Sequence, residues 1–369
     1  MRDVHPITAD IKLQISEQPQ DSRWDQFVAS VPGGHHVQTS LWGQVKATLG
    51  WSTKRILATH QDTIIAGAQI LYRQIPLIGG IGYVVKGPLS HYADPGLAEC
   101  VLRELLEFSQ NQHLLVVVVQ PPNDDNGAVA HPLSLMGFQP SAVELTATAS
   151  ILIDLSVGLD DIMAQMKRRT RQNIARSERE GIVVREGTKE DLPTLCSFNA
   201  ATCRRQNVRP FSERYFAKMW EVLEPFGYVK MLLAEYNHEP VSALMIVPFR
   251  DTVIAKVLGW SGLYPDRRPN EAVFWAAMKW SKSHGYRWFD LEGVDRSGAQ
   301  HVLSGQALPE PLQKKPDFFK YGFGGQVVLY PEAYEQIHNS VLRWGYSKLF
   351  SGGTNKGLSF RISEIIRKR

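Results

Sequence analysis

The chain has 369 residues, a length that favours two domains of about 150 residues each. Its 43% hydrophobic and 21% charged residues are values typical of globular proteins. No stretch approaches about 18 consecutive apolar residues, so we expect no transmembrane helix, and no signal peptide is apparent at the start. The three cysteines have neither metal-ligand nor redox spacing, which fits a reducing cytoplasm.

Charge is unevenly distributed along the chain. Residues 1–150 carry 9 basic and 13 acidic side chains, whereas the remainder carries 32 basic and 24 acidic ones. A basic second half indicates an anionic partner, such as phosphate groups, RNA or a lipid surface.

The first predicted elements form an ordered series. A helix is expected to begin near Thr39. Residues 55–72 contain two apolar runs around a polar turn, which predicts a β-hairpin. A strand over 81–85, a helix over 96–110 with spaced apolar positions and a buried strand over 114–119 are then expected.

The same order returns in the second half of the chain. Residues 231–248 predict a hairpin and 252–258 a strand; a helix over 270–283 and a strand over 286–291 follow. Chance similarity of two α/β segments is the alternative. The matched order favours an internal repeat.

A hairpin followed by strand, helix and strand resembles the core order of the GNAT acyltransferase fold, here written twice. The resemblance implies an α/β protein (sheet-and-helix, α+β) with two tandem GNAT-like domains. In that fold two neighbouring strands splay apart and the gap binds an acyl donor. Ligands commonly bind at domain interfaces, so a cleft between the domains is predicted.

A basic segment lies between the two series. Residues 167–189 hold eight Lys or Arg, with four glutamates interleaved or adjacent, and predict a helix followed by a strand at 182–185. Lys167, Arg168 and Arg171 either line a groove for phosphates or belong to a solvated face of salt bridges. Residues 343–369 carry seven basic side chains and one acidic; they either contact RNA or anionic lipid headgroups, or only aid solubility.

One lysine near the end of the series is enclosed by aromatic residues. It lies in residues 317–325, DFFKYGFGG, after 22 residues (295–316) that we expect to be a loop because they are rich in Gly, Ser, Gln and Pro. Aromatic side chains exclude water and so strengthen the interaction of a cation with developing negative charge. Glycines let a backbone approach a ligand closely. The alternative is a strand end followed by a glycine turn.

Four segments in order resemble signatures of the FemA/FemB/FemX family. They begin with residues 38–51, QTSLWGQVKATLGW, and continue with 148–184, 269–294 and 319–325. Together they span about 38 to 330, nearly the whole chain. The order of the four segments along the chain is the order in which the family has them.

The resemblance implies an aminoacyltransferase that moves an amino acid from aminoacyl-tRNA to an amine of a peptidoglycan precursor, either UDP-MurNAc-peptide or lipid II. It implies no cofactor, and a place in the cytoplasm at or near the inner face of the membrane. It also implies a discontinuous first domain, residues 1–150 joined by 326–369, around a second domain of residues 151–325.

Several residues match family positions that hold the precursor. Lys46 corresponds to a lysine that contacts the diphosphate, a role that suits a mobile point charge. Trp42, four residues earlier, lies on the same helical face and is either a ligand contact or part of the core. Arg209 and Tyr215 correspond to an arginine and a tyrosine that also bind the precursor, although the local spacing leaves Arg205 and Arg214 as alternatives for the arginine.

The reaction itself is assigned to two residues. Lys320, beside Phe319, matches the family lysine of the transfer site, where an ammonium would stabilise the oxyanion formed when an amine attacks the aminoacyl ester. Asp290 ends a predicted strand and would either orient or deprotonate the amine, or bind backbone amides. Glu292 is a weaker candidate, and Lys256 stands near a position where the family often has a tyrosine.

Two other functions remain open. One is an acyl-CoA-dependent N-acyltransferase that acts on a sugar, a polysaccharide precursor or a small amine, although the strand-to-helix joints at 86–94 and 259–268 lack the usual pyrophosphate-binding string. The other is a non-catalytic RNA- or membrane-binding protein. A hydrolase is disfavoured because neither a Gly-x-Ser-x-Gly elbow nor a His-Glu-x-x-His helix is present.

Overall fold

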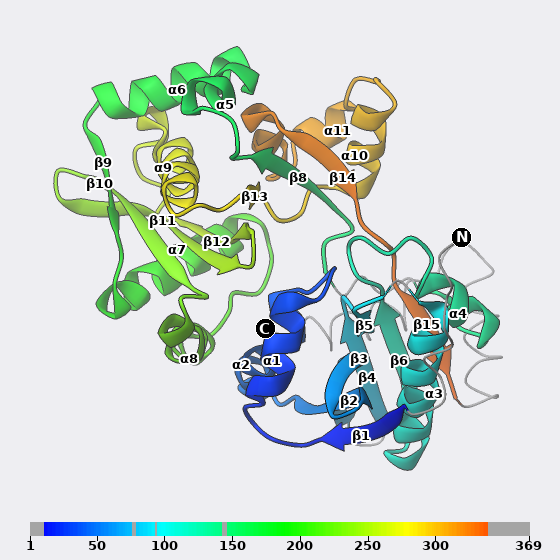
Figure 1. Ribbon diagram of the computed structural model, residues 1–369. Helices are drawn as coiled ribbons and strands as arrows, with labels where there is room; N and C mark the ends of the chain where they lie inside the picture. Colours follow the sequence, from blue (N-terminus) through cyan, green and yellow to red (C-terminus); the bar gives the residue numbers. More distant parts are fainter. Residues whose placement is uncertain (1–10, 76–78, 93, 142–145, 339–369) are drawn as a thin grey trace. The chain divides into compact units, whose positions relative to one another are not determined.

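The computed structural model describes residues 11–75, 79–92, 94–141 and 146–338 (Figure 1). The chain divides into two compact units: the first extends to Thr146 and resumes at Pro331, and the second covers Ala147–Tyr330. Each unit is built around one mixed sheet. The basic residues 343–369 lie outside the described part of the chain.

The sheet of the first unit has the strand order β1-β2-β3-β4-β6-β15-β7, and β5 pairs with β3. Its strands are β1 (Lys12–Ser16), β2 (Ser52–His60), β3 (Thr63–Ile75), β4 (Gly79–Val85), β5 (Leu89–Ser90), β6 (Leu114–Gln120), β7 (Gln139–Pro140) and β15 (Tyr334–Ile337). Its α-helices are α1 (Ser22–Ser30), α2 (Ser40–Ala47), α3 (Pro95–Asn111) and α4 (Ala130–Leu135).

The sheet of the second unit has the order β14-β8-β13-β12-β11-β10-β9. Its strands are β8 (Ala149–Asp154), β9 (Ile182–Glu186), β10 (Lys230–Tyr236), β11 (Glu239–Phe249), β12 (Thr252–Trp260), β13 (Trp288–Asp290) and β14 (Gln326–Leu329). Its α-helices are α5 (Leu159–Gln165), α6 (Arg168–Arg179), α7 (Leu192–Arg205), α8 (Glu213–Leu223), α9 (Pro269–Ser283), α10 (Arg296–Leu303) and α11 (Glu310–Gln313).

The predicted internal repeat is confirmed by the strand pairing. Both predicted hairpins form, as antiparallel β2–β3 and antiparallel β10–β11. In each unit the next strand pairs in parallel with the strand after a helix: β4 with β6 across α3, and β12 with β13 across α9. Parallel neighbours need such a crossover, because a tight turn cannot return the chain to the same end of the sheet.

The two parallel pairs differ in length. In the first unit the pairing continues to Val85 and Gln120, at the ends of both strands. In the second it covers three positions and stops at Ile254 and Asp290, while β12 continues to Trp260 alongside β11. The far half of β12 therefore has a partner strand on one edge only.

Helices cover both faces of the second sheet. Leu232 and Leu244 belong to one core cluster with residues of α9, whereas their neighbours Leu233 and Ala243 are equally buried outside that cluster. Since successive side chains of a strand point to opposite faces, a second layer must cover the other face. Helix α7 supplies it, and Gly259 of β12 permits the close approach, because a Cβ there would overlap Phe198 and the α7 backbone.

The expected loop over residues 295–316 is wrong. The segment contains α10 and α11. The side chain of Asp295 caps α10 by accepting the N–H of Gly298 at 3.0 Å, which satisfies a donor that a helix start leaves unpaired. The Gly-, Ser-, Gln- and Pro-rich composition of residues 295–316 therefore did not indicate that α10, a short helix with an N-cap, forms there. The alternative of a strand end over residues 317–325 is also wrong, because 318–323 form a 3₁₀ helix that precedes β14.

The glycines after Lys320 allow the chain to pack closely on itself rather than on a ligand. A Cβ on Gly322 would overlap the Thr170 hydroxyl, and one on Gly324 would overlap the carbonyl oxygen of Gln165. Lys167 also donates its backbone N–H to the Gly322 carbonyl at 2.9 Å. The segment that carries Lys320 is thus held against the start of α6.

We expect Gly324→Ala to destabilise the protein more than Gly227→Ala. Both glycines have positive φ, 73° and 69°, but Gly227 is left-handed with ψ 15°, whereas Gly324, with ψ −147°, lies in a region that residues with a side chain rarely enter. Nothing lies within 4 Å of the new Cβ at Gly227, whereas at Gly324 it meets backbone. The overlap and the less favourable backbone conformation together should add about 1–3 kcal/mol, measured as a lower urea midpoint than that of Gly227→Ala. Equal midpoints would contradict the packing argument.

Candidate functional site

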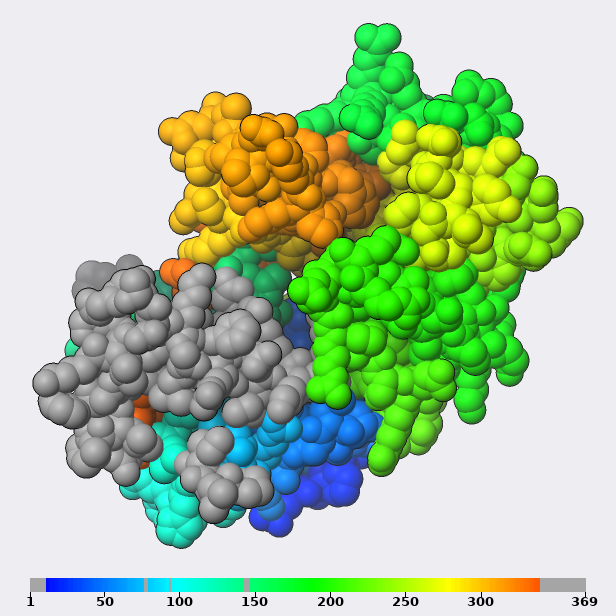
Figure 2. Space-filling model, turned by 180° about the vertical axis from the view of Figure 1, so that it is seen from behind, coloured from blue at the N-terminus to red at the C-terminus, as the bar shows by residue number. Residues whose placement is uncertain are grey.

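A cavity of about 370 Å³ opens in the second unit where β12 and β13 have separated. Its wall includes Lys256 of β12, Cys203 of α7, Phe274 of α9, Glu292 after β13 and Lys320. The space-filling view shows the orange surface of the later segment adjoining the green and yellow surface of the earlier ones (Figure 2). Residues over a hundred positions apart in the sequence thus share one wall.

The Lys320 ammonium is held by backbone carbonyls. It donates to the carbonyl oxygens of Glu292 at 2.7 Å and Gly293 at 2.8 Å. Its third N–H has no acceptor among the residues that the structure describes. Burial lowers the pKa of Lys320, while the charges of Glu292, Asp317 and Asp290 act to raise it. The result is a half-buried, oriented cation with one donor left for a ligand oxygen.

Phe319 forms an apolar part of the same wall. Its ring meets those of Phe274 and Phe323 edge-on, at centroid distances of 5.5 and 6.0 Å. An aromatic surface beside the ammonium lowers the local dielectric and strengthens its interaction with an anion.

Residues 290–293 form a strained turn at the end of β13. Glu292 has a positive φ of 37°, an uncommon conformation for a residue with a side chain. Its N–H donates to Asp290 Oδ1 at 2.7 Å, and its carbonyl accepts from Lys320. Such strain persists only where surrounding contacts determine it, and it concentrates at functional sites.

Asp290 supports this turn from within the core. It is 6% exposed and is not part of the cavity wall. Oδ1 accepts from the Ser150 hydroxyl as well as from the Glu292 N–H, and Oδ2 accepts from the Tyr330 hydroxyl at 3.2 Å. Burial, followed by the Asp290 charge, raises the pKa of Tyr330, so this phenol remains a donor.

Replacing Asp290 by Asn should therefore destabilise the second unit. An amide has one accepting oxygen, so its NH₂ group would face either the Ser150 and Glu292 donors or the Tyr330 hydroxyl. We expect a loss of about 1–3 kcal/mol in the free energy of unfolding, measured by urea denaturation. Asp251→Asn, at an exposed turn, is the matched control and should change it by less than about 0.5 kcal/mol. An unchanged midpoint for Asp290→Asn would show that the turn does not depend on the carboxylate.

Arg209 and Tyr215 lie close in sequence to residues of the wall. Arg209 is exposed between α7 and α8, and its neighbours Val208 and Phe211 line the cavity. Tyr215 is 2% exposed and its ring stacks on Phe211 at 4.3 Å. The alternative Arg205 donates to the Trp260 carbonyl at 2.6 Å. Arg205, Arg209 and Arg214 are all exposed, and Tyr215 supports the wall through Phe211.

Lys46 and Trp42 belong to the first unit. Helix α2 begins at Ser40, as expected, with Thr39 as its N-cap. Lys46 lies in the last turn, with Nζ 5.6 Å from the Trp42 ring centroid. Trp42 is 4% exposed, so it serves mainly as core packing beneath the lysine. The helix start is anchored because Gln69 donates to the Thr39 carbonyl at 2.7 Å.

The ion pair between Lys256 and Glu292 was not predicted from the sequence, which named both residues but did not connect them. Their side chains join β12 to the 290–293 turn across the gap. One signal was available: Lys256 is the only charged residue in the strand TVIAKVLGW. Its partner lies 36 residues away, so the pair itself could not be read from spacing.

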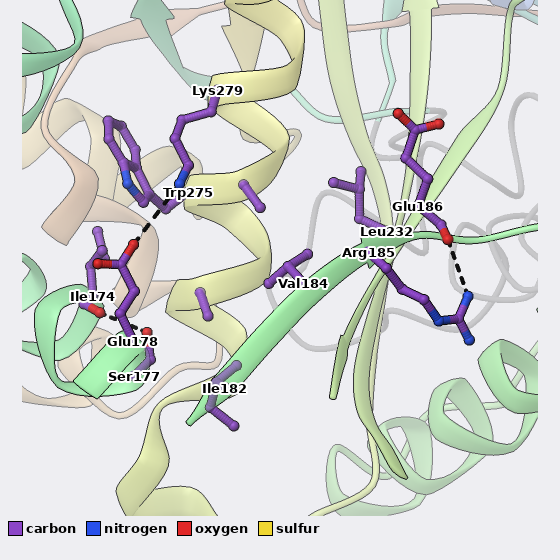
Figure 3. Close-up of a pocket in the computed structure, with 12 residues that line it drawn as sticks. Ile174, Ser177, Glu178, Ile182, Val184, Arg185, Glu186, Leu232, Trp275 and Lys279 are labelled. Atoms are coloured by element: carbon purple, nitrogen blue, oxygen red, sulfur yellow. Dashed lines mark hydrogen bonds and ion pairs between the residues drawn. The ribbon is translucent and has the colours of Figure 1, made fainter. Parts of the chain in front are cut away.

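A second cavity, of about 280 Å³, lies between α6, α9, β9 and β10 (Figure 3). Figure 3 shows Glu178 of α6 pointing toward Lys279 of α9, an ion pair of 3.9 Å. Arg185 is paired with Asp191 at 2.8 Å and Glu235 at 2.7 Å. These charges neutralise one another, so this cavity is less suited to catalysis, and this part of the basic segment is a salt-bridged face.

Two further properties concern the described residues only. None of their helices combines the length and apolar character needed to cross a bilayer. No group of three or more His, Cys, Asp or Glu among them is placed to hold a metal ion.

Sequence comparison finds relatives over more than half of the chain. The sequence model of the FemAB family matches residues 20–239. A protein of Staphylococcus saprophyticus named lipid II:glycine glycyltransferase is 22% identical over 240 residues, which are 62% of this chain and 57% of the relative. The chain thus spans little more than half the length of the curated relatives it matches.

Solved structures share the fold. The crystal structure of FemX has a TM-score of 0.77 at 15% identity, over 90% of this chain and 99% of that one. A tandem GNAT protein from the clavulanic acid biosynthesis pathway has a TM-score of 0.50 at 8% identity, over 88% and 98%. The predicted α/β fold with tandem GNAT-like domains is thereby confirmed.

Proposed function

The chain belongs to the FemAB family, and from that premise we propose that it transfers an amino acid from aminoacyl-tRNA to an amine of a peptidoglycan precursor, either UDP-MurNAc-peptide or lipid II. The observation that carries the proposal is the oriented Lys320 ammonium in the wall of the cavity beside β12. The name of the Staphylococcus relatives supports lipid II as the acceptor class.

Lys320 supplies the electrostatic part of the reaction. Attack of a neutral amine on the aminoacyl ester places negative charge on the carbonyl oxygen of the tetrahedral intermediate. The remaining N–H of Lys320 donates to that oxygen, and its two carbonyl contacts keep the ammonium in place. A preorganised donor of this kind needs no reorganisation as charge develops. As the intermediate collapses, the C–O bond to the ribose breaks, the attacking nitrogen loses a proton and the departing ribose oxygen gains one, which leaves the new amide and a ribose hydroxyl.

Asp290 acts in this proposal as a positioning residue. It receives the Glu292 N–H and so maintains the turn whose carbonyls hold Lys320. Phe319 excludes water from the ammonium. Removing the Asp290 carboxylate would therefore lower the reaction rate indirectly, because the Lys320 ammonium would no longer be held in place.

Lys46 and Arg209 are the residues that we propose as contacts of the acceptor. Lys46 would contact the diphosphate, above the supporting ring of Trp42. Arg209 would bind a second anionic group of the precursor, and Tyr215 keeps the neighbouring wall in shape through Phe211. The basic residues 343–369 would add affinity for an anionic membrane surface.

Acyl-CoA is the alternative donor. A pyrophosphate is usually held by successive backbone N–H groups at the start of a helix. At the start of α9, Pro265 and Pro269 lack that donor, and the N–H of Arg267 is used by the Tyr264 carbonyl at 3.0 Å. This joint is poorly equipped for CoA, which favours the tRNA donor.

Transfer of radiolabelled amino acids from total charged tRNA to UDP-MurNAc-pentapeptide or lipid II tests the proposal. We expect labelling that ribonuclease abolishes. Lys320→Met should reduce the rate at least about 100-fold, because an oxyanion donor is lost. Lys279→Met, at the exposed lysine of the second cavity, is the matched control and should retain activity. Labelling from acetyl-CoA alone, or none from charged tRNA, would overturn the proposal.

The pH profile reports on Lys320. Its pKa is lowered from the ordinary 10.5, chiefly by burial, so the ammonium is lost at a lower pH than for an exposed lysine. We expect kcat/KM to fall on the alkaline side below pH 10.5, as the proton leaves. Lys320→Arg should move that limb to higher pH, since a guanidinium stays charged. If the unmodified protein and Lys320→Arg lose activity over the same alkaline pH range, the group that titrates there is not Lys320.

A further inference from the structure

The carboxylate of Glu292 has an unused acceptor inside the catalytic cavity. Its Oε1 accepts from the Lys256 ammonium. Its Oε2 accepts no hydrogen bond from any residue in the described part of the chain, although the side chain is only 21% exposed. A carboxylate normally accepts several hydrogen bonds, so a half-buried oxygen without one is an available ligand site.

The position of this carboxylate is set from both sides. The Glu292 backbone is clamped by Asp290 and Lys320 in a positive-φ conformation. Lys256 occupies a β-bulge: Ile246 pairs with Ala255 and Met245 with Val257, so Lys256 is the extra residue. Bulges next to active sites redirect a side chain. Here the redirected ammonium holds Oε1, which preorganises Oε2 for a ligand.

The cavity wall is balanced in charge. It contains two cations, Lys256 and Lys320, and two anions, Glu292 and Asp317. Asp317 accepts the Asp295 N–H through Oδ2 at 2.6 Å, so each of the two carboxylates has one oxygen without a hydrogen-bond partner in the described part of the chain. A ligand that brings both a cation and a developing oxyanion would therefore find a carboxylate oxygen for the cation and Lys320 for the oxyanion, and Glu292 is the carboxylate whose own carbonyl holds Lys320.

We propose that Glu292 binds the α-ammonium of the aminoacyl group, so that the cavity selects α-aminoacyl donors over simple acyl donors. The inference rests on the function proposed above. In an aminoacyl ester the amine nitrogen and the carbonyl oxygen are three bonds apart. Lys320 donates to the carbonyl of Glu292 itself, so the binding groups for these two atoms flank one turn. An acetyl group has no hydrogen-bond donor for Glu292 Oε2, so this oxygen would lose its water without gaining a partner.

Lys256 is a positioning residue in this scheme. It does not contact the donor but keeps the carboxylate in one orientation through Oε1. Lys256→Met should weaken the selectivity for a free α-amine, and Lys256→Arg should restore it, because a guanidinium can still hold the carboxylate.

Binding and transfer with matched donors test the inference. The probes are glycyl-tRNA and N-acetylglycyl-tRNA, together with stable 3′-amide analogues of glycyl-RNA and N-acetylglycyl-RNA for binding. We expect the unmodified protein to bind the free-amine analogue at least about tenfold more tightly, and Glu292→Gln to remove that preference by weakening only the free-amine analogue. Glu186→Gln, at an exposed glutamate of the second cavity, should behave like the unmodified protein.

Each other outcome is decisive. Equal binding of both analogues by the unmodified protein, with transfer intact, would overturn the Glu292 assignment alone. If the protein neither binds the RNA analogues nor transfers an amino acid from any charged tRNA, both the proposed function and this inference are overturned. A Glu292→Gln variant that loses rate equally with both donors, and retains its binding preference, would indicate a general base. Thermal unfolding of the Glu292 and Lys256 variants, checked first, establishes that they are folded.

Discussion

The early separation of β12 from β13 determines the site. Two parallel strands pair at three positions, up to Ile254 and Asp290, and then part. Unpaired backbone in a protein interior is costly, so the gap has to be lined by other groups. The α7 residues, the 316–320 segment and the Lys256–Glu292 ion pair form that lining, and the space that remains is the cavity.

In the first unit the same order of elements forms a sheet in which the corresponding strands, β4 and β6, do not separate. There β4 and β6 stay paired to Val85 and Gln120, and the backbone continues to pair beyond, as the Gly87 N–H meets the Gln120 carbonyl at 3.1 Å. The corresponding gap is closed. The sequences explain the difference: β6 is a run of valines that continues the sheet, whereas β13 ends at Asp290 and a positive-φ turn follows.

Strain and electrostatics are coupled at this turn. Asp290 receives the Glu292 N–H, Lys320 binds the Glu292 carbonyl, and Lys256 holds the Glu292 side chain. Each contact fixes the same residue by a different group, which explains how a non-glycine residue is maintained at positive φ. The same contacts orient an ammonium and a carboxylate side by side. The glycines that follow Lys320 bring its segment close enough for this arrangement.

The sequence by itself determined the repeat, the hairpins and the crossover helices, and it made Lys320 a candidate for the cation of the site. These follow from local periodicity and from residue types that are rare in such surroundings. It misassigned residues 295–316, because the single hydrogen bond that caps α10 outweighs a loop-like composition. Only the tertiary structure decided that β12 and β13 part, that Asp290 faces the core, and that Glu292 pairs with Lys256. These depend on contacts between residues distant in sequence, whose free energy is set by packing and burial rather than by local preference.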